Sequence, residues 1–596
     1  MSQKITELLG KKIVVCDGAM GTMMQRHGLK PGGLPELLSF TDPEIIKEIH
    51  RNYYQAGSDF VSANTFGCNR YKLANSGYTV LQVVTEAVKL AKEAAQEAIE
   101  PSALQGNLIS DKFVALDVGP IGKLMAPAGD LTFDEAYDIF KEVVVAGEKA
   151  GADFVLFETF IDIYEMKAAV LAAKENSELP VFCSVTFQKN GRMLMGSDPL
   201  TAVSILQDLG IDALGVNCSL GPKEMIGIVK EFLACSKLPV LVQPNAGLPA
   251  LVDGEAVYSV DVSEYVEAMR EMLRAGVAIA GGCCGTNPDY IAALSKLTQA
   301  EDFPALQPDA DKTRKRKAVT SVSCSTKTVV FNGRVRIIGE RINPTGKILL
   351  TEALKTKNFS YIKKEAASQA KAGADILDVN VWLPDIDELE MMIEVIKKIS
   401  LVNVPLSIDS ADPGVIEAAA RYYNGKPLIN SVNGSKESME AVFPIVKKYG
   451  ACVIALTLDE RGLPHNVEER LAIAERIIQT AETYGIGRKR ILVDCLTLTA
   501  SAQQNAGRDT LEAIRRIKKQ YGVKTVLGVN NVSYGLPERK LLNGTFLAMA
   551  LEAGLDAPIT DPLAPEYRNV IHAFEVLASK DINAEDYVRI YGGRTD

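Results

Sequence analysis

The chain has 596 residues, beyond the size at which one hydrophobic core stops growing, so we expect at least two domains. Its 47% hydrophobic and 23% charged residues are ordinary globular usage, and no apolar run is long enough to span a bilayer. The net charge of -10 disfavours a nucleic-acid partner, and the basic run 312–317 (KTRKRK) is interpreted as a solvated linker segment. The first residues lack the apolar core of a signal peptide, which predicts a cytoplasmic protein with no membrane partner.

Short apolar runs that alternate with helical periodicity predict parallel strands in the first half of the chain. Two runs follow a glycine that ends a helix, in QAGSDF (55–60) and KAGADF (149–154), where glycine can take the left-handed cap conformation. The predicted strands of this half are 13–16, 60–63, 113–116, 154–157, 181–185, 213–216, 240–242 and 277–280.

A second set of apolar runs begins after residues 301–330, which contain prolines and mixed charge but no sustained period. These runs are 335–339, 376–379, 405–408, 428–429, 453–456, 491–493, 526–529 and, less clearly, 557–560. Such strands fit either a doubly wound sheet or a closed barrel. Two sets of eight favour barrels of about 250 residues each, and the glycine-rich phosphate loop of a doubly wound fold is missing. We therefore predict an α/β fold of two (β/α)8 TIM barrels in tandem, over residues 1–300 and 331–596, joined by a linker at 301–330.

Three of the ten cysteines converge on one end of the first predicted barrel. Cys218 follows the sixth strand, and Cys283 and Cys284 follow the eighth within GGCCG, at the strand ends where barrel enzymes place their chemistry. The flanking glycines permit the unusual dihedrals that two adjacent residues need to face one ion. Three thiolates with an open fourth position are typical of catalytic zinc, whose natural substrate here is a thiol. The remaining cysteines are assigned to the core: Cys16, Cys68, Cys183, Cys235, Cys324, Cys452 and Cys495.

Other strand ends of this half carry acids and amides, namely Asp17, Asn64, Asp117 and Glu158. Acids in a barrel mouth are easier to explain as ligands for a substrate ammonium group than as core residues. Partners for the amine and carboxylate of a small thiol substrate are therefore expected at these positions.

Five motifs of this half resemble the homocysteine S-methyltransferase family: DGAMGT (17–22), ANTFG (63–67), ETF (158–160), GVNCS (215–219) and GGCCGT (281–286). In that family three cysteines bind zinc, which activates homocysteine. Acidic side chains hold the substrate ammonium, and backbone groups receive its carboxylate. The resemblance assigns zinc to Cys218, Cys283 and Cys284, and homocysteine to Asp17, Gly18, Ala19, Glu158 and Asn217.

The strand ends of the second half carry carboxylates and amides but no evident nucleophile. Such a rim suits a flat heterocycle with several hydrogen-bond donors and acceptors along one edge. Capping of the following helices is the alternative for any one residue, and it explains the whole set poorly. The residues are Glu340, Asn343, Asp378, Asn380, Asp409, Asn430, Asp494, Asn530 and Asn531.

The second half resembles the pterin-binding methyltransferases, which include methyltetrahydrofolate–corrinoid enzymes and dihydropteroate synthase. The motifs are GERINPTG (339–346), LDVN (377–380), SIDS (407–410), INSVNG (429–434), VDCLT (493–497) and GVNNVSYG (528–535). The resemblance implies that Asp409, Asn430 and Asp494 bind the pterin edge and that Asn531 approaches N5, with Asn530 as the neighbouring alternative. Asp494 and Asn531 are the expected catalytic residues, and Glu340, Asn343 and Asn380 complete the folate-binding set.

The order of the two modules resembles the front of the cobalamin-dependent methionine synthase family. This implies that 5-methyltetrahydrofolate methylates cob(I)alamin, and that zinc-activated homocysteine takes the methyl group from methylcobalamin to give methionine. The chain shows no Asp-x-His-x-x-Gly motif, so a cobalamin-binding module outside it, or a separate protein, is the expected partner. A fusion with a methylenetetrahydrofolate reductase-like barrel, a non-catalytic binding protein and another thiol acceptor remain alternatives.

Overall fold

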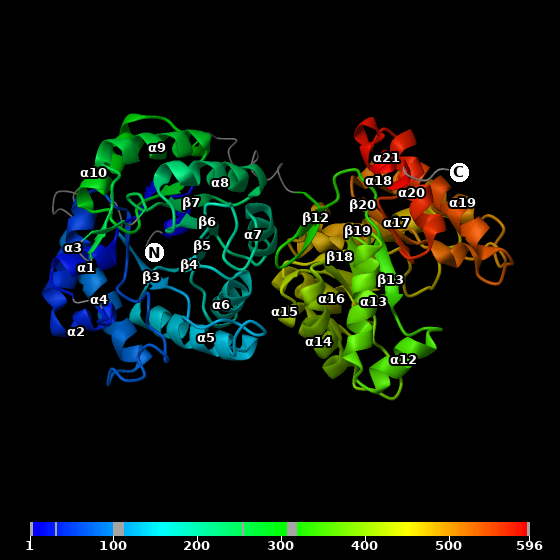
Figure 1. The fold of residues 1–596 in the computed structure, drawn as a ribbon, viewed down its shortest axis with the longest axis horizontal. Helices are drawn as coiled ribbons and strands as arrows, with labels where there is room; N and C mark the ends of the chain where they lie inside the picture. Colours follow the sequence, from blue (N-terminus) through cyan, green and yellow to red (C-terminus); the bar gives the residue numbers. More distant parts are fainter. Residues whose placement is uncertain are drawn as a thin grey trace. The chain divides into compact units, whose positions relative to one another are not determined.

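The computed structural model describes residues 4–29, 32–98, 112–248, 250–252, 255–306 and 319–592, and it divides into two compact units at Ala318 and Val319. Figure 1 shows parallel strands surrounded by helices in each unit. Among the described residues, no helix has the length and apolar character needed to cross a membrane. The basic run 312–317 lies outside the described residues.

The first unit contains a parallel sheet in the order β1-β10-β7-β6-β5-β4-β3-β2, and a bridge between Cys16 and Phe60 joins its two edges. All eight predicted strands are present, and the sheet curls into a barrel. The strands are β1 (Val14–Val15), β2 (Phe60–Ser62), β3 (Phe113–Val118), β4 (Phe154–Phe160), β5 (Val181–Val185), β6 (Ala213–Asn217), β7 (Val240–Gln243) and β10 (Ile279–Ala280).

Helices cover the outside of this barrel, and a small antiparallel hairpin, β8 (Ala250–Val252) and β9 (Glu255–Val257), follows β7. The helices are α1 (Met20–Arg26), α2 (Leu38–Thr41), α3 (Pro43–Gln55), α4 (Val80–Ala98), α5 (Phe133–Ala150), α6 (Ile163–Asn176), α7 (Pro199–Leu206), α8 (Pro222–Cys235), α9 (Val262–Ala275) and α10 (Pro288–Ala300).

The second unit is a closed barrel of parallel strands in the order β13-β14-β15-β17-β18-β19-β20-β21. The strands are β13 (Ile338–Ile342), β14 (Ile376–Val379), β15 (Leu406–Asp409), β17 (Leu428–Asn433), β18 (Cys452–Leu456), β19 (Ile491–Asp494), β20 (Lys524–Gly528) and β21 (Ala557–Thr560). The helices are α12 (Ile348–Lys355), α13 (Phe359–Lys371), α14 (Glu388–Ile399), α15 (Pro413–Tyr422), α16 (Lys436–Lys448), α17 (Val467–Thr483), α18 (Ala506–Tyr521), α19 (Arg539–Glu552), α20 (Pro565–Leu577) and α21 (Glu585–Tyr591). The predicted fold of two (β/α)8 barrels is confirmed.

Aspartates that precede strands recur as a structural device in both barrels. Asp59 lies just before β2 and accepts a hydrogen bond from the backbone N–H of Val15, at 2.9 Å. Asp153 before β4 does the same for Val114, at 2.7 Å, and Asp375 before β14 for Ile337, at 2.9 Å. These carboxylates pair strand-end N–H groups that would otherwise be left without partners. The glycine caps predicted before them are also present, with φ of 104° at Gly57 and 88° at Gly151.

Part of the segment predicted to be a linker belongs to the second barrel. Residues 319–330 form an antiparallel hairpin of β11 (Ser321–Cys324) and β12 (Thr328–Val330), which pairs with the short strand β16 (Gly425–Lys426). Val322, Val329 and Phe331 are buried against the first residues of the barrel strands. The hairpin therefore covers the N-terminal end of the barrel, and its short alternating strands explain why the sequence showed no longer period.

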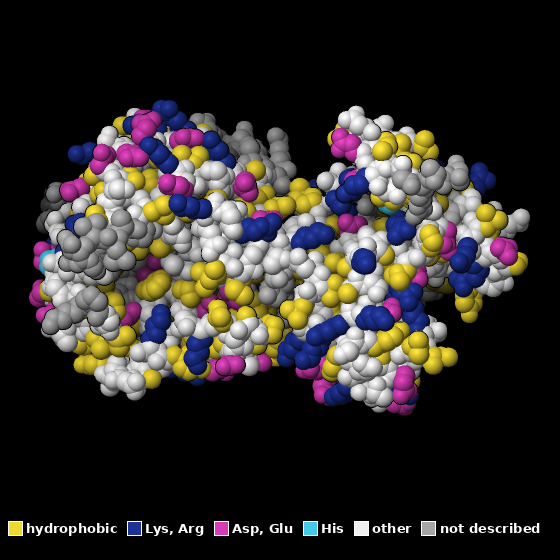
Figure 2. Space-filling model, in the orientation of Figure 1, with side chains coloured by type: hydrophobic (Ala, Val, Ile, Leu, Met, Phe, Trp, Pro, Cys, Tyr) yellow, Lys and Arg dark blue, Asp and Glu magenta, His cyan; other side chains and the backbone are white. Residues whose placement is uncertain are grey.

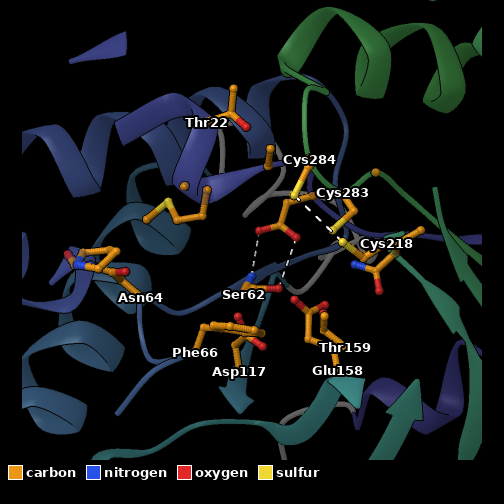
Figure 3. Close-up of a pocket in the computed structure, with 18 of the residues that line it drawn as sticks. Thr22, Ser62, Asn64, Phe66, Asp117, Glu158, Thr159, Cys218, Cys283 and Cys284 are labelled. Atoms are coloured by element: carbon orange, nitrogen blue, oxygen red, sulfur yellow. Dashed lines mark hydrogen bonds between the residues drawn. The ribbon is translucent and has the colours of Figure 1, made fainter. Parts of the chain in front are cut away.

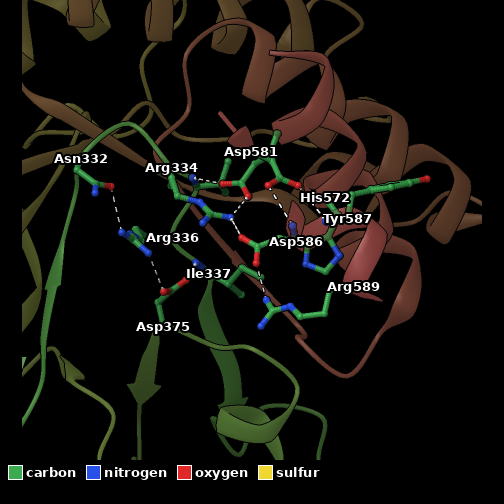
Figure 4. Close-up of polar contacts among 12 residues, drawn as sticks. Asn332, Arg334, Arg336, Ile337, Asp375, His572, Asp581, Asp586, Tyr587 and Arg589 are labelled. Atoms are coloured by element: carbon green, nitrogen blue, oxygen red, sulfur yellow. Dashed lines mark hydrogen bonds and ion pairs between the residues drawn. The ribbon is translucent and has the colours of Figure 1, made fainter. Parts of the chain in front are cut away.

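The last helices are fastened to the same barrel by an ionic cluster beside β13 (Figure 4). The Arg334 guanidinium contacts Glu575 at 2.9 Å and Asp586 at 2.8 Å, and Glu575 also accepts the Val335 N–H at 3.0 Å. Glu575 is 5% exposed, so its charge needs the nearby cation. Elsewhere, Figure 2 shows cationic and anionic side chains interspersed over the visible face of each unit.

Candidate functional site

A cavity of about 290 Å³ opens at the C-terminal ends of the strands of the first barrel. Its lining includes Asp17 after β1, Asp117 on β3, Glu158 on β4, Cys218 after β6 and Cys283 after β10. The structure therefore brings the predicted cysteines and acids together at one mouth, as Figure 3 shows.

The three thiols of the predicted metal site form one cluster. The sulfur atoms of Cys218, Cys283 and Cys284 all lie within 4.8 Å of one another, and those of Cys218 and Cys284 are 4.0 Å apart. Cys218 has a positive φ of 57°, an uncommon conformation for a residue other than glycine, and it directs the thiol toward the other two. A Cβ atom at Gly282 would lie 2.3 Å from Thr286 Oγ1, so the CC pair needs glycine before it.

The cluster also favours a charged sulfur. Hydrogen bonds from Cys218 and Cys283 lower the pKa of Cys284 to about 3, because a thiolate accepts from both neighbouring thiols. The Cys218 and Cys283 pKa values rise correspondingly, to about 12 for Cys218. Three sulfur donors with one already anionic suit a soft or borderline metal ion.

Three carboxyl groups line the same cavity from the C-terminal ends of β1, β3 and β4, and Figure 3 labels two of them, Asp117 and Glu158. Asp17 accepts hydrogen bonds from the Ser62 backbone N–H at 2.8 Å and hydroxyl at 3.2 Å, yet burial raises its pKa to about 7. Burial raises the pKa of Glu158 to about 8, and repulsion from the nearby Asp17 and Cys284 charges adds to this effect. Burial, with Glu158 and Asp17, raises the pKa of Asp117, whose buried Oδ1 has no hydrogen-bond partner among the described residues. Together the acids form a ready site for a cation.

The remaining predicted homocysteine ligands have different surroundings. Gly18 and Ala19 line the cavity just before α1, and a Cβ at Gly18 would lie 2.6 Å from Thr286 Oγ1. Asn217 instead lies buried behind the cavity wall, where its Oδ1 accepts from the Thr159 N–H at 2.9 Å and from Ser184 Oγ at 2.7 Å. Its Nδ2 donates to Thr159 Oγ1 at 2.7 Å. These bonds let Asn217 shape the end of β4, and its predicted contact with homocysteine stays a prediction.

In the second barrel, the predicted polar side chains gather at the C-terminal ends of three adjacent strands, β14, β15 and β17. Asn380 donates to Asp409 at 3.1 Å, and Asn430 donates to Asp378 at 3.2 Å. Burial, followed by repulsion from Asp378, raises the pKa of Asp409 to about 7. A carboxyl group that changes protonation near neutral pH can either donate or accept a hydrogen bond.

Asp494 lies opposite this group of residues, at the end of β19. It is 8% exposed, and one carboxylate oxygen accepts the Leu496 N–H at 2.7 Å. Burial raises its pKa to about 7. The second carboxylate oxygen remains for a ligand.

A third group surrounds the end of β13. Burial raises the pKa of Glu340 to about 7, and its Oε1 accepts from Asn530 Nδ2 at 2.5 Å. Asn531 is exposed one residue further along the 3-10 helix η7 (Val529–Ser533), and its amide nitrogen is 3.2 Å from where a Cβ of Gly528 would lie. Both asparagines thus stand at the end of β20. Asn343 accepts the Thr345 N–H at 3.0 Å and forms the turn after β13.

Comparisons with known proteins divide the chain in the same way. Residues 14–298 match the family model "Homocysteine S-methyltransferase", and residues 339–561 match "Pterin binding enzyme". The chain joins a homocysteine S-methyltransferase domain to a pterin-binding domain.

The curated relatives include methionine synthases from Mycobacterium leprae and Mycobacterium tuberculosis. The first is 33% identical over 593 residues, which are 93% of this chain and 48% of that protein. The second is 32% identical over 617 residues, which are 98% of this chain and 49% of that protein. The chain therefore spans about half the length of the curated relatives it matches.

Solved structures resemble parts of the chain. The homocysteine methyltransferase MmuM from Escherichia coli, in its oxidised form, is 23% identical and covers 48% of this chain and 96% of its own, with a TM-score of 0.41. Dihydropteroate synthase from Xanthomonas albilineans, in complex with 7,8-dihydropteroate, is 20% identical and covers 44% of this chain and 99% of its own, with a TM-score of 0.34.

Sequence patterns alone missed several residues of both sites. In the homocysteine S-methyltransferase domain, Tyr258 lies over the CC pair, since a Cβ at Gly285 would be 2.3 Å from its ring. Asn245 follows β7, whose last residue Gln243 lines the cavity, and its buried Oδ1 is unpaired among the described residues. In the pterin-binding domain, Asn543 and Tyr567 bond to Asn530 from helices. None of these four directly follows a predicted strand, which was the signal used to select site residues.

The raised pKa of Glu158 predicts how pH affects stability. Below about pH 8 the folded domain holds a proton that the unfolded chain releases near its ordinary value of 4.5, so stability falls as pH rises through this window. Glu158→Gln cannot ionise and should lose much of this dependence. We expect the metal-free variant to be more stable than wild type at pH 8.5 and similar at pH 4.5, in urea denaturation followed by circular dichroism. The exposed control Glu231→Gln should follow wild type, and parallel curves for all three proteins would contradict the prediction.

Proposed function

We propose that the chain is the methyl-transfer part of a methionine synthase, with homocysteine as the acceptor in the first barrel and 5-methyltetrahydrofolate as the donor in the second. The thiol cluster beside a buried set of acids is the observation that carries this proposal. The matches of the two halves to the two domain families, and the relatives named methionine synthase, support it.

The donor set of the first site fits a zinc ion. Cys218, Cys283 and Cys284 would hold it through sulfur, three ligands being the number at catalytic rather than structural zinc sites. Zinc bound there lowers the pKa of a substrate thiol, so that a nucleophilic thiolate forms at neutral pH.

The protein side chains position the amino acid portion of the substrate. Asp17 and Glu158 bind its ammonium group, and a positive charge between them returns their raised pKa values toward the ordinary range. The backbone at Gly18 and Ala19, which lines the cavity, receives the carboxylate. Glycine is needed at position 18 because a Cβ there would lie 2.6 Å from Thr286 Oγ1. These contacts hold the sulfur for an in-line displacement.

The second site binds the pterin of methyltetrahydrofolate. Asp494, Asp409 and Asn430 bond to its edge, and Asn380 orients Asp409. We assign N5 to Asn531, with Asn530 as the neighbouring alternative, and a ring N–H group of the pterin to Glu340. Proton donation to N5 makes tetrahydrofolate a better leaving group. The methyl acceptor is cobalamin, carried by a module or protein outside this chain.

One experiment separates the proposed function from the alternative functions. A reductase-like second barrel is disfavoured because residues 339–561 match the pterin-binding family. Metal analysis of the purified chain should give one zinc per chain, and the chain should transfer the methyl group of methyltetrahydrofolate to added cob(I)alamin. A chain that binds both substrates but transfers no methyl group would be a binding protein, and one without zinc would lack the proposed first site.

A further inference from the structure

Asn530 is held at the mouth of the second barrel by two helical side chains that no motif includes. Its Oδ1 accepts from the Tyr567 hydroxyl at 2.7 Å and from Asn543 Nδ2 at 3.2 Å. Asn543 Nδ2 also donates to the Tyr567 oxygen, at 2.9 Å. Tyr567 lies on α20 and Asn543 on α19, and they are 6% and 3% exposed.

These contacts determine which way the Asn530 amide points. Because Tyr567 accepts a hydrogen bond from Asn543, its own proton is free to go to Asn530, and the second N–H of Asn543 goes there too. Two donors meet at one atom, which must be the amide oxygen. The amide nitrogen of Asn530 then faces Glu340, whose Oε1 it reaches at 2.5 Å.

From this geometry we propose that Tyr567 and Asn543 are positioning residues that keep the Asn530 nitrogen toward Glu340, so that Glu340 stays ionised and accepts hydrogen bonds from the pterin. The proposal rests on the proposed function, in which Glu340 contacts the folate. A flipped Asn530 would present its oxygen to Glu340 and favour the protonated acid, which donates instead of accepting.

The other groups that face Glu340 leave its protonation open to such control. Lys347 favours the ionised form, whereas Asp561 and Asp378 oppose it, and burial outweighs each of them in raising its pKa to about 7. The hydrogen bond from Asn530 also favours the ionised form, so a reversed amide would raise the pKa of Glu340 further.

The test is Tyr567→Phe in the full chain, which removes one hydroxyl and keeps the ring. Binding of 5-methyltetrahydrofolate is measured by fluorescence quenching from pH 5.5 to 9. We expect about tenfold weaker binding near pH 6.5 and little change at pH 9. The acidic side of the binding profile should move upward by about one pH unit, because that shift corresponds to the free energy of about one hydrogen bond to a charged group.

Tyr423→Phe is the matched control, because Tyr423 is a fully buried tyrosine of the same barrel whose hydroxyl donates to the Ser323 carbonyl at 2.9 Å. It should lower stability and leave the pH profile of binding in place. In a Glu340→Gln background, Tyr567→Phe should have a much smaller effect, because an amide at position 340 can pair with either orientation of Asn530.

Three kinds of result would overturn the proposal or its basis. An unchanged pH profile in Tyr567→Phe, or a loss that is equal at every pH and matched by Tyr423→Phe, would reduce Tyr567 to a structural residue. Full additivity with Glu340→Gln would show that it does not act through Glu340. Wild-type protein that fails to bind 5-methyltetrahydrofolate would refute the proposed function as well, and so differs from the first two results.

Discussion

Cys283→Ser is expected to abolish both zinc binding and homocysteine methylation. Cys283 is one of three sulfur donors within 4.8 Å of one another, and a serine hydroxyl is neither soft nor ionised at neutral pH. Even residues that only support metal ligands cost about 10- to 100-fold when changed, so the loss of a ligand should exceed a hundredfold in zinc affinity. Metal analysis after dialysis, with an assay of methionine formation, measures the effect.

The control is Cys235→Ser, at the end of α8, where the thiol bonds to the Glu231 carbonyl within its own helix. It should keep its zinc and its activity. Methyl transfer from methyltetrahydrofolate to free cob(I)alamin should survive in Cys283→Ser, because the proposed function assigns that step to the other barrel. Full zinc content in Cys283→Ser would disprove the assignment of the metal site.

The strands and the thiol cluster were predictable from sequence for a common physical reason. A strand buried on both faces must be apolar along its length, so its end is visible where polar residues begin. Cys218 and the CC pair both stand directly after such runs, and parallel barrel strands bring their ends to one mouth. Asp17 and Asp494 were found by the same rule.

Contacts that depend on how helices pack were not predictable in this way. Asn543 lies in the middle of α19, where its sequence surroundings resemble those of any helical asparagine. Only the packing of α19 and α20 brings it to Asn530. Asn217 also stands at a strand end, where the structure uses its amide to fix Thr159, and its contact with a ligand stays a prediction. Adjacency to a strand end therefore locates a mouth but does not say which side chains enter it.

Asp494→Asn should weaken 5-methyltetrahydrofolate binding by about a hundredfold, which corresponds to the upper range of hydrogen bonds to a charged group. The amide can still accept the Leu496 N–H through Oδ1, so the local backbone should be retained. Its NH2 group then replaces the carboxylate oxygen that faces the mouth, and it would meet N–H donors of the pterin edge. The loss is therefore due to opposed donors rather than to unfolding, and binding titrations together with a thermal melt separate the two.

Asp375→Asn is the matched change at the opposite end of the barrel, where the carboxylate accepts from Ile337 and Arg336 and caps the start of β13. It should lower stability with folate affinity unchanged. If Asp494→Asn bound folate as tightly as wild type, the pterin edge would lie elsewhere in the mouth. A buried acid that contacts the ligand must affect binding more than it affects folding. If both variants lost folate affinity in proportion to their loss of stability, Asp494 would therefore have only a structural role.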